Sequence, residues 1–168
     1  GDHIILPPGI HQVDNPITIT SDVKIEGYSR FASANQLRKT NDDDLIYAED
    51  CSFHMASVSL SGEGVADTTD GLRTIQAALT DDPAGVTDVY MYDVHVVDMG
   101  RDGIHLGSGN LSQFQNIECQ RNDRDGFWAS GTDANAFTLT MYHSSSNGRH
   151  GFYNPGSYGV DIIGGYAT

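Results

Sequence analysis

A short phrase that returns four times along the chain constrains its fold more than any other feature. An Asp-Gly or His-Gly pair precedes an alternation of apolar and variable residues at positions 70–74, 102–106, 125–129 and 150–154. The glycines stand at 71, 103, 126 and 151, in steps of 32, 23 and 25 residues. Near-regular recurrence of this kind indicates a stack of similar units, in which alternate side chains point inward and outward.

A second apolar segment recurs along the chain with nearly the same spacing as the first. The triplets that begin at Val94 and Ile117 lie nine residues before a repeat glycine, and the triplet that begins at Met141 lies ten before one. Two strands therefore recur per repeat, with no room for a crossover helix of about a dozen residues. The spacing predicts an all-β parallel solenoid of about six coils, in which each strand pairs with its equivalent one turn later.

The opening of the chain carries a family resemblance. A Leu6-Pro7-Pro8-Gly9 turn interrupts an apolar strand, and residues 17–27 alternate strictly between apolar and polar. In these features the chain resembles the right-handed parallel β-helix superfamily, which includes pectate lyases, polygalacturonases and phage tailspikes. The resemblance implies a right-handed β-helix. It transfers no activity, because the polygalacturonase signatures are missing and no local pattern confirms the catalytic basic residue of pectate lyases.

We expect one β-helix domain over residues 1–168, with loop insertions at about 28–44 and 80–87. Neither end of the stack looks capped in sequence, and an uncapped stack exposes unpaired backbone and apolar surface. This predicts a segment of a longer protein, or ends that are covered by partners in a homo-oligomer such as a trimer.

The net charge of the chain limits the kinds of partner that it can bind. The formal net charge is −14, and no basic stripe is visible in the sequence, which argues against nucleic acid and against insertion into anionic membranes. Nineteen Asp accompany only two Lys, Lys24 and Lys39. Turns favour Asp, but turns do not explain the scarcity of Lys. An acidic, Lys-poor surface resembles proteins of high-salt organisms, so a halophilic source is one interpretation.

Cys51 and Cys119 are too few for a disulfide framework and fall on different coils at inward positions. We expect them to be buried free thiols that pack as small hydrophobic groups. Their spacing does not suggest a zinc site.

The outward positions of the repeats are the candidate binding residues. If the apolar residue after each repeat glycine points inward, then Arg73, His105, Trp128 and Tyr153 point outward from successive coils, about 5 Å apart. Aromatic rings beside polar tips are suited to sugars. The other strand predicts a second outward column of His95, Glu118 and Tyr142. A subunit interface and plain surface are the alternatives for both columns.

The repeated Asp residues, Asp70, Asp102 and Asp125, are the candidates for catalysis. Neighbouring carboxylates at roughly 5 Å would suit a retaining glycosidase, with Asp102, Asp125 and His105 as acid or base groups. The competing interpretation is that these Asp residues stabilise turns by accepting bonds from backbone amides. A calcium ion that bridges the carboxylates is a third interpretation, although the ligand spacing of an EF-hand is absent.

These features together predict a glycan-recognising β-helix domain of a virion or cell-surface protein, similar to a tailspike or receptor-binding segment. The expected partner is a polysaccharide or a cell-surface glycan, and the expected location is extracellular, at a cell surface or on a virion. The first alternative is a secreted polysaccharide lyase or glycoside hydrolase. The second is an architectural virion or surface-layer component.

Overall fold

The structure is a computed structural model, and it describes residues 1–31, 34–62, 70–75, 88–134, 136–156 and 159–168. The described residues form strands and no helix, and therefore no helix there could cross a membrane. The strands are β1 (Asp2–Ile5), β2 (Gly9–Val13), β3 (Ile17–Ile19), β4 (Val23–Glu26), β5 (Asn35–Lys39), β6 (Ile46–Glu49), β7 (Ser52–Ser61), β8 (Leu72–Ile75), β9 (Asp88–Val97), β10 (Ile104–Ser108), β11 (Gln113–Gln120), β12 (Phe127–Asp133), β13 (Thr138–Ser145), β14 (Phe152–Tyr153) and β15 (Asp161–Ala167).

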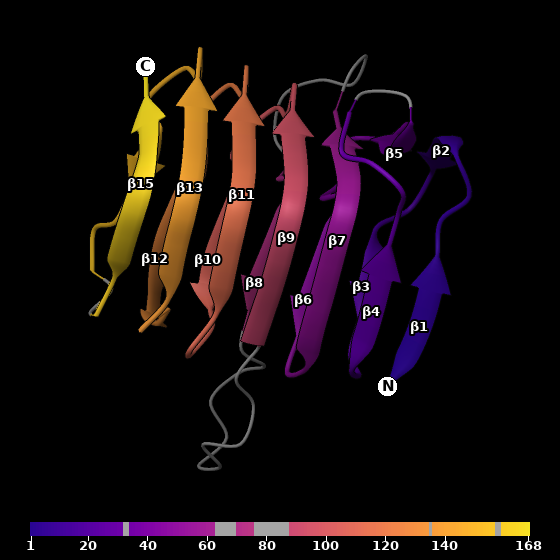
Figure 1. Ribbon diagram of the computed structural model, residues 1–168, viewed down its shortest axis with the longest axis horizontal. Helices are drawn as coiled ribbons and strands as arrows, with labels where there is room; N and C mark the ends of the chain where they lie inside the picture. The colour runs from indigo at the N-terminus through magenta and orange to yellow at the C-terminus, as the bar shows by residue number, and fades with distance from the viewer. Residues whose placement is uncertain (32–33, 63–69, 76–87, 135, 157–158) are drawn as a thin grey trace.

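The strands build two parallel sheets that face each other along the whole stack (Figure 1). Sheet A runs in the order β1-β4-β7-β9-β11-β13-β15, with β5 pairing both β2 and β7. Sheet B runs in the order β14-β12-β10-β8-β6-β3. The chain passes from one sheet to the other and rises by one strand per turn, with the two termini at opposite ends (Figure 1). The predicted all-β parallel solenoid of about six coils is confirmed.

Sheet B carries the repeated phrase, and its register is the one that the sequence predicts. Leu72 pairs with Ile104, Ile104 with Phe127, and Phe127 with Phe152. Leu72, Ile104 and Phe127 are fully buried, and Phe127 packs edge-to-face on Phe114 of sheet A with the ring centroids 4.9 Å apart. The apolar residue after each repeat glycine therefore fills the space between the two sheets. Cys51 and Cys119 are buried free thiols, as expected.

The repeat glycines are required by close packing between coils. A Cβ added to Gly103 would lie 2.7 Å from the carbonyl oxygen of Gly126, and one added to Gly126 would lie 2.6 Å from that of Gly151. Neither glycine is among the residues with positive φ. The glycine in each phrase thus lets the backbone of the next coil approach, whereas the sequence suggested only a turn former.

The long strands of sheet A contain a bend that shifts the inward and outward alternation. Ser57, Asp93, Asn116 and Met141 occupy equivalent places on four successive coils with φ between 53° and 57°. After this left-handed residue the next side chain points inward, so Tyr142 is 4% exposed and its hydroxyl donates to the Gly151 carbonyl oxygen. The expectation that Tyr142 joins the column of His95 and Glu118 is wrong, because His143 pairs with Glu118 instead.

The expected insertion at 28–44 is only partly a loop. It contains β5, which continues sheet A by pairing with β2 and β7, because its Leu37 alternates into the core. The expected insertion at 80–87 lies outside the described residues. At the two ends of the stack, apolar side chains are exposed on β1 and β15, including Ile5 at 60% and Ile163 at 59%.

Candidate functional site

The outer face of sheet B gathers the predicted column. Tyr47 pairs with Arg73, Arg73 with His105, His105 with Trp128, and Trp128 with Tyr153. The structure therefore brings all four predicted members together in register and adds Tyr47. The His105 and Trp128 rings are stacked with their centroids 4.1 Å apart, and His105 is only 7% exposed.

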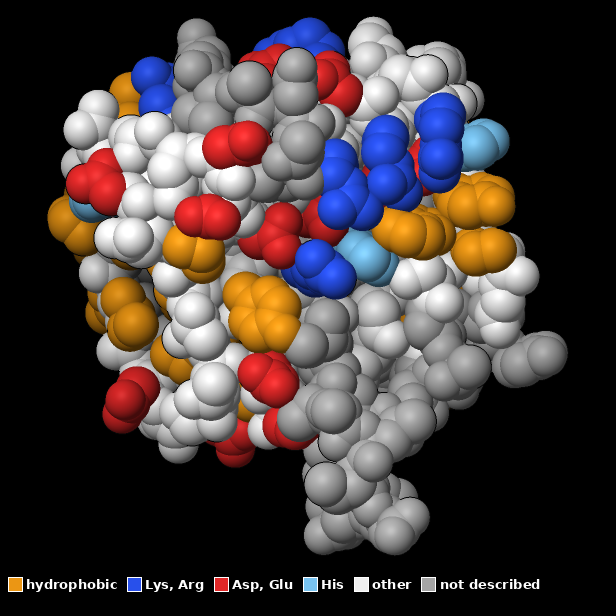
Figure 2. Space-filling view, turned by 180° about the vertical axis from the view of Figure 1, so that it is seen from behind, with side chains coloured by type: hydrophobic (Ala, Val, Ile, Leu, Met, Phe, Trp, Pro, Cys, Tyr) orange, Lys and Arg blue, Asp and Glu red, His pale blue; other side chains and the backbone are white. Residues whose placement is uncertain are grey.

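An arginine row runs beside this column. Arg101, Arg124 and Arg149 each stand two residues before a repeat glycine, so the coils place them one above the other along the entry to sheet B. Figure 2 shows a row of Lys or Arg side chains next to hydrophobic and histidine side chains. The Arg124 guanidinium lies 4.6 Å from the Trp128 ring centroid, and the Arg149 guanidinium 5.3 Å from that of Tyr153. His105 and Arg124 thus both pack on the Trp128 ring, which is half-buried.

The repeated Asp residues form a ladder beneath the arginines. The Asp44 carboxylate accepts the Asp70 backbone N–H, and Asp70 accepts that of Asp102. In the same way Asp102 accepts the N–H of Asp125, and Asp125 accepts that of His150, with donor–acceptor distances of 2.9–3.1 Å along the ladder. The Asp70, Asp102 and Asp125 side chains are fully buried. The backbone-capping interpretation of these residues is confirmed.

Each arginine neutralises the ladder member of the coil below it. Arg101 lies 3.8 Å from Asp70, Arg124 lies 3.2 Å from Asp102, and Arg149 pairs with Asp125. The arginine side chains remain 28–45% exposed while their partners are inaccessible, so the surface that a ligand meets is the positive side of each pair. A local cationic strip therefore exists on a strongly acidic chain.

Within the ladder, the Asp102 carboxyl has a strongly raised pKa. Burial, followed by the negative charge of Asp70, raises the pKa of the Asp102 carboxyl to about 6. The Asp125 N–H and the Arg124 guanidinium oppose this shift, but they do not offset the desolvation.

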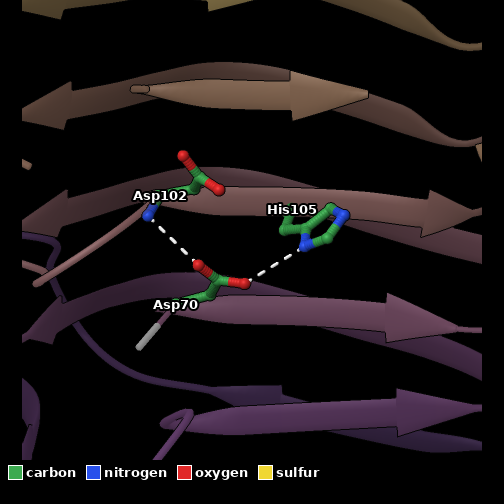
Figure 3. Close-up of side chains that lie close together, drawn as sticks. All are labelled: Asp70, Asp102 and His105. Carbon is green, nitrogen blue, oxygen red and sulfur yellow. Dashed lines mark hydrogen bonds and ion pairs between the residues drawn. The ribbon is translucent and has the colours of Figure 1, made fainter. Parts of the chain in front are cut away.

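His105 connects the ladder to a residue that the sequence did not single out. Its Nδ1 faces Asp70 Oδ2 (Figure 3) at a distance of 3.1 Å, and its Nε2 lies 2.7 Å from Ser130 Oγ. Ser130 stands two residues after Trp128 on β12, so its alternation with Trp128 was a readable signal. The arginine row was readable as well, from the Arg that precedes Asp102, Asp125 and His150.

Asp70, Asp102 and His105 could supply three metal-ligand atoms within 4.8 Å of one another. Their other contacts do not favour a cation. Asp70 Oδ2 already faces the imidazole, and Arg101 and Arg124 already place positive charge against the two carboxylates. A divalent ion would have to displace these guanidinium groups, so we interpret the cluster as part of the ladder.

The second predicted column lies apart from the first, on sheet A. Glu118 pairs with His95 in register, and Arg30 packs over the column, 3.7 Å from Glu118 and 3.1 Å from Asp93. Burial lowers the pKa of His95, and the nearby Glu118 charge opposes this. This column is therefore partly covered by the chain itself and is not brought together with the residues of sheet B.

The two parallel sheets and their stacked columns define a right-handed parallel β-helix protein. No protein-family model matches the chain, and no curated protein sequence matches it. Among solved structures the chain is similar to the A-module of the mannuronan C-5 epimerase AlgE4 of Azotobacter vinelandii, with a TM-score of 0.63 and 18% sequence identity. The match covers 89% of this chain and 50% of that one, so this chain matches half the length of its structural neighbour. At this identity the likeness establishes the fold.

Proposed function

We propose that the outer face of sheet B binds a carboxylated polysaccharide. The arginine row beside the column of Arg73, His105, Trp128 and Tyr153 carries this proposal. Guanidinium groups recognise carboxylates with two parallel hydrogen bonds, and aromatic rings beside polar tips are suited to sugars. A polymer laid along the stack would meet the same pair of elements on each coil. The similar structure is named as an enzyme that acts on mannuronan, a polymer of an acidic sugar, which agrees with an anionic ligand.

Binding assays with mannuronan and with neutral dextran test this proposal. We expect saturable binding of mannuronan that weakens with added salt, and little binding of dextran, because the arginines must find anionic partners. Trp128→Ala and Arg73→Gln should each weaken binding about tenfold, equivalent to roughly 1.4 kcal/mol. The matched control is Arg121→Gln, because Arg121 pairs with Asp98 at 2.8 Å outside both columns. Equal binding of both polymers, or an Arg121→Gln effect as large as that of Arg73→Gln, would contradict the proposal.

A second candidate function is polysaccharide cleavage by a lyase or hydrolase. The observation that favours it is the Asp102 carboxyl, whose pKa of about 6 suits proton transfer near neutral pH, on the same coil as His105. Release of reducing ends or of unsaturated sugars from mannuronan, lost in Asp102→Asn, would support this function. The complete burial of Asp102 and Asp125 makes binding the stronger candidate.

For the biological setting we propose a virion tail or a cell surface, with the chain in a homo-oligomer such as a trimer. An acidic polysaccharide ligand is typical of surfaces outside the cell. The genes that neighbour the coding sequence test the setting, since tail or capsid genes support it and polysaccharide-degradation genes support the enzyme. Light scattering gives the oligomeric state, and burial of Trp128 in a subunit contact would favour an architectural role.

A further inference from the structure

Ser130, His105 and Asp70 form a relay on three successive coils. Ser130 Oγ lies 2.7 Å from His105 Nε2, and His105 Nδ1 lies 3.1 Å from Asp70 Oδ2. A hydroxyl, an imidazole and a carboxylate in this order are the groups that activate a serine nucleophile. Polysaccharide binding alone does not explain why an imidazole should be fixed at both nitrogens.

The carboxylate end of the relay is rigid. Asp70 is fully buried, and its second oxygen accepts the backbone N–H of Asp102 at 3.1 Å. Because a carboxylate only accepts, it selects the His105 tautomer with the proton on Nδ1 and leaves the Nε2 lone pair directed at Ser130. The Trp128 ring stacked on His105 would stabilise the imidazolium that forms when Nε2 takes a proton.

The strand that carries Ser130 is irregular at this residue. Leu106 pairs with Ala129, but Ser108 pairs with Asp133, so three residues of β12 lie opposite one residue of β10. Such a bulge interrupts the regular ladder, and bulges are common beside active sites.

We propose that Ser130 and His105 hydrolyse short acyl esters, such as O-acetyl groups, on sugar hydroxyls, with Asp70 as the positioning residue. Ser130 Oγ bonds to the carbonyl carbon, the carbonyl electron pair moves to oxygen, and the hydroxyl proton passes to His105 Nε2. Collapse of the oxyanion breaks the bond to the sugar oxygen, which takes that proton. Water then attacks the acyl-serine through the same imidazole, which releases the carboxylic acid and restores Ser130.

The choice of a sugar ester rests on the proposed polysaccharide function. Trp128 and Ser130 are two residues apart on β12 and on the same outward face, which separates them by roughly 7 Å along the strand. A sugar held at Trp128 would therefore place a substituent at Ser130.

The test uses p-nitrophenyl acetate and a fluorophosphonate probe, neither of which needs a bound polysaccharide. We expect one covalent fluorophosphonate adduct on Ser130 by peptide mass spectrometry, and ester hydrolysis that falls at least about 100-fold in Ser130→Ala. The matched control is Ser52→Ala. Ser52 Oγ also lies near an imidazole nitrogen, 3.3 Å from His54 Nε2, but the described residues place no carboxylate on that ring. An unlabelled Ser130, or equal hydrolysis by the wild type, Ser130→Ala and Ser52→Ala, would overturn the proposal.

Nitrogen NMR of the imidazole separates positioning from a purely structural role of Asp70. The wild type should show His105 with Nδ1 protonated and Nε2 bare, whereas Asp70→Asn should lose this preference and most of the fluorophosphonate labelling. Retained labelling with an unchanged tautomer in folded Asp70→Asn would exclude Asp70 from the relay. Mannuronan binding measured on the same wild-type sample tells the two hypotheses apart. Hydrolysis without binding contradicts only the polysaccharide function, and binding without hydrolysis contradicts only the esterase.

Discussion

At the scale of single residues, Asp102 combines a structural and an electrostatic role. Its carboxylate accepts the Asp125 backbone N–H across two coils and faces Arg124, yet it is wholly removed from water. The sequence left open whether this Asp stabilises a turn or takes part in catalysis. The fully buried ladder shows the structural role directly, and the raised pKa of the Asp102 carboxyl follows from the burial that the ladder requires.

Stability should therefore depend on pH through Asp102. Its ordinary pKa is 3.8, and its pKa in the folded protein is about 6, so between these values the folded state holds a proton that the unfolded state has lost. The stabilisation from this proton is present below about pH 4 and is lost as the pH rises through about 6, a change of about 3 kcal/mol. Urea unfolding across this range should show the wild type losing this stability relative to Asp102→Asn.

The exposed Asp123 provides the control for this measurement. Asp123→Asn should follow the pH dependence of the wild type. If Asp102→Asn also follows the wild type at every pH, the buried carboxyl is not the source of the effect.

At the scale of elements, the sequence predicted the register of sheet B because the Asp-Gly phrase marks the same point on each coil. It could not predict the position of Tyr142, because the left-handed conformation of Met141 is not evident from a methionine. It also missed β5, since residues 28–44 lack the repeated phrase. The alternation with Trp128 indicates that Ser130 faces outward, but its contact with His105 needed the structure. Its distance to His105 depends on a bulge whose extent only the strand pairing reveals.

The spacing between coils gives a prediction at the same scale. Gly126→Ala should destabilise the protein by about 1–3 kcal/mol, because the new methyl group would press on backbone that cannot move without shifting a coil. The atom it meets, the Gly151 carbonyl oxygen, lies 2.6 Å away. Gly156→Ala is the matched control, since among the described residues no atom beyond its chain neighbours lies within 4 Å of its Cβ position. Thermal unfolding of both variants is the measurement, and equal melting temperatures would refute the packing argument.

At the scale of the whole molecule, charge is distributed unevenly. The net charge of −14 suggested from sequence that no basic stripe exists, yet the coils align arginines from separate repeats into one row. Composition could not reveal this, because the alignment depends on the register between coils. Each arginine of the row faces a buried carboxylate, so the remaining acidic residues account for the repulsion across the surface.

That repulsion predicts a salt dependence. Raising the NaCl concentration from about 0.05 M to about 1 M shortens the screening length to roughly 3 Å and should raise the melting temperature by several degrees. Such a rise would agree with the high-salt origin that the composition suggests. A melting temperature that stays constant, or falls, across this range would show that self-repulsion does not limit stability.

The most direct test of polysaccharide binding on sheet B uses the single tryptophan of the chain, Trp128. The Trp128 ring contacts both His105 and Arg124, so its fluorescence reports on the proposed binding column. Titration with mannuronan oligosaccharides should produce a saturable change in Trp128 emission, with the midpoint at the dissociation constant that calorimetry gives. Calorimetric binding that leaves the emission unchanged would place the ligand elsewhere and contradict the account.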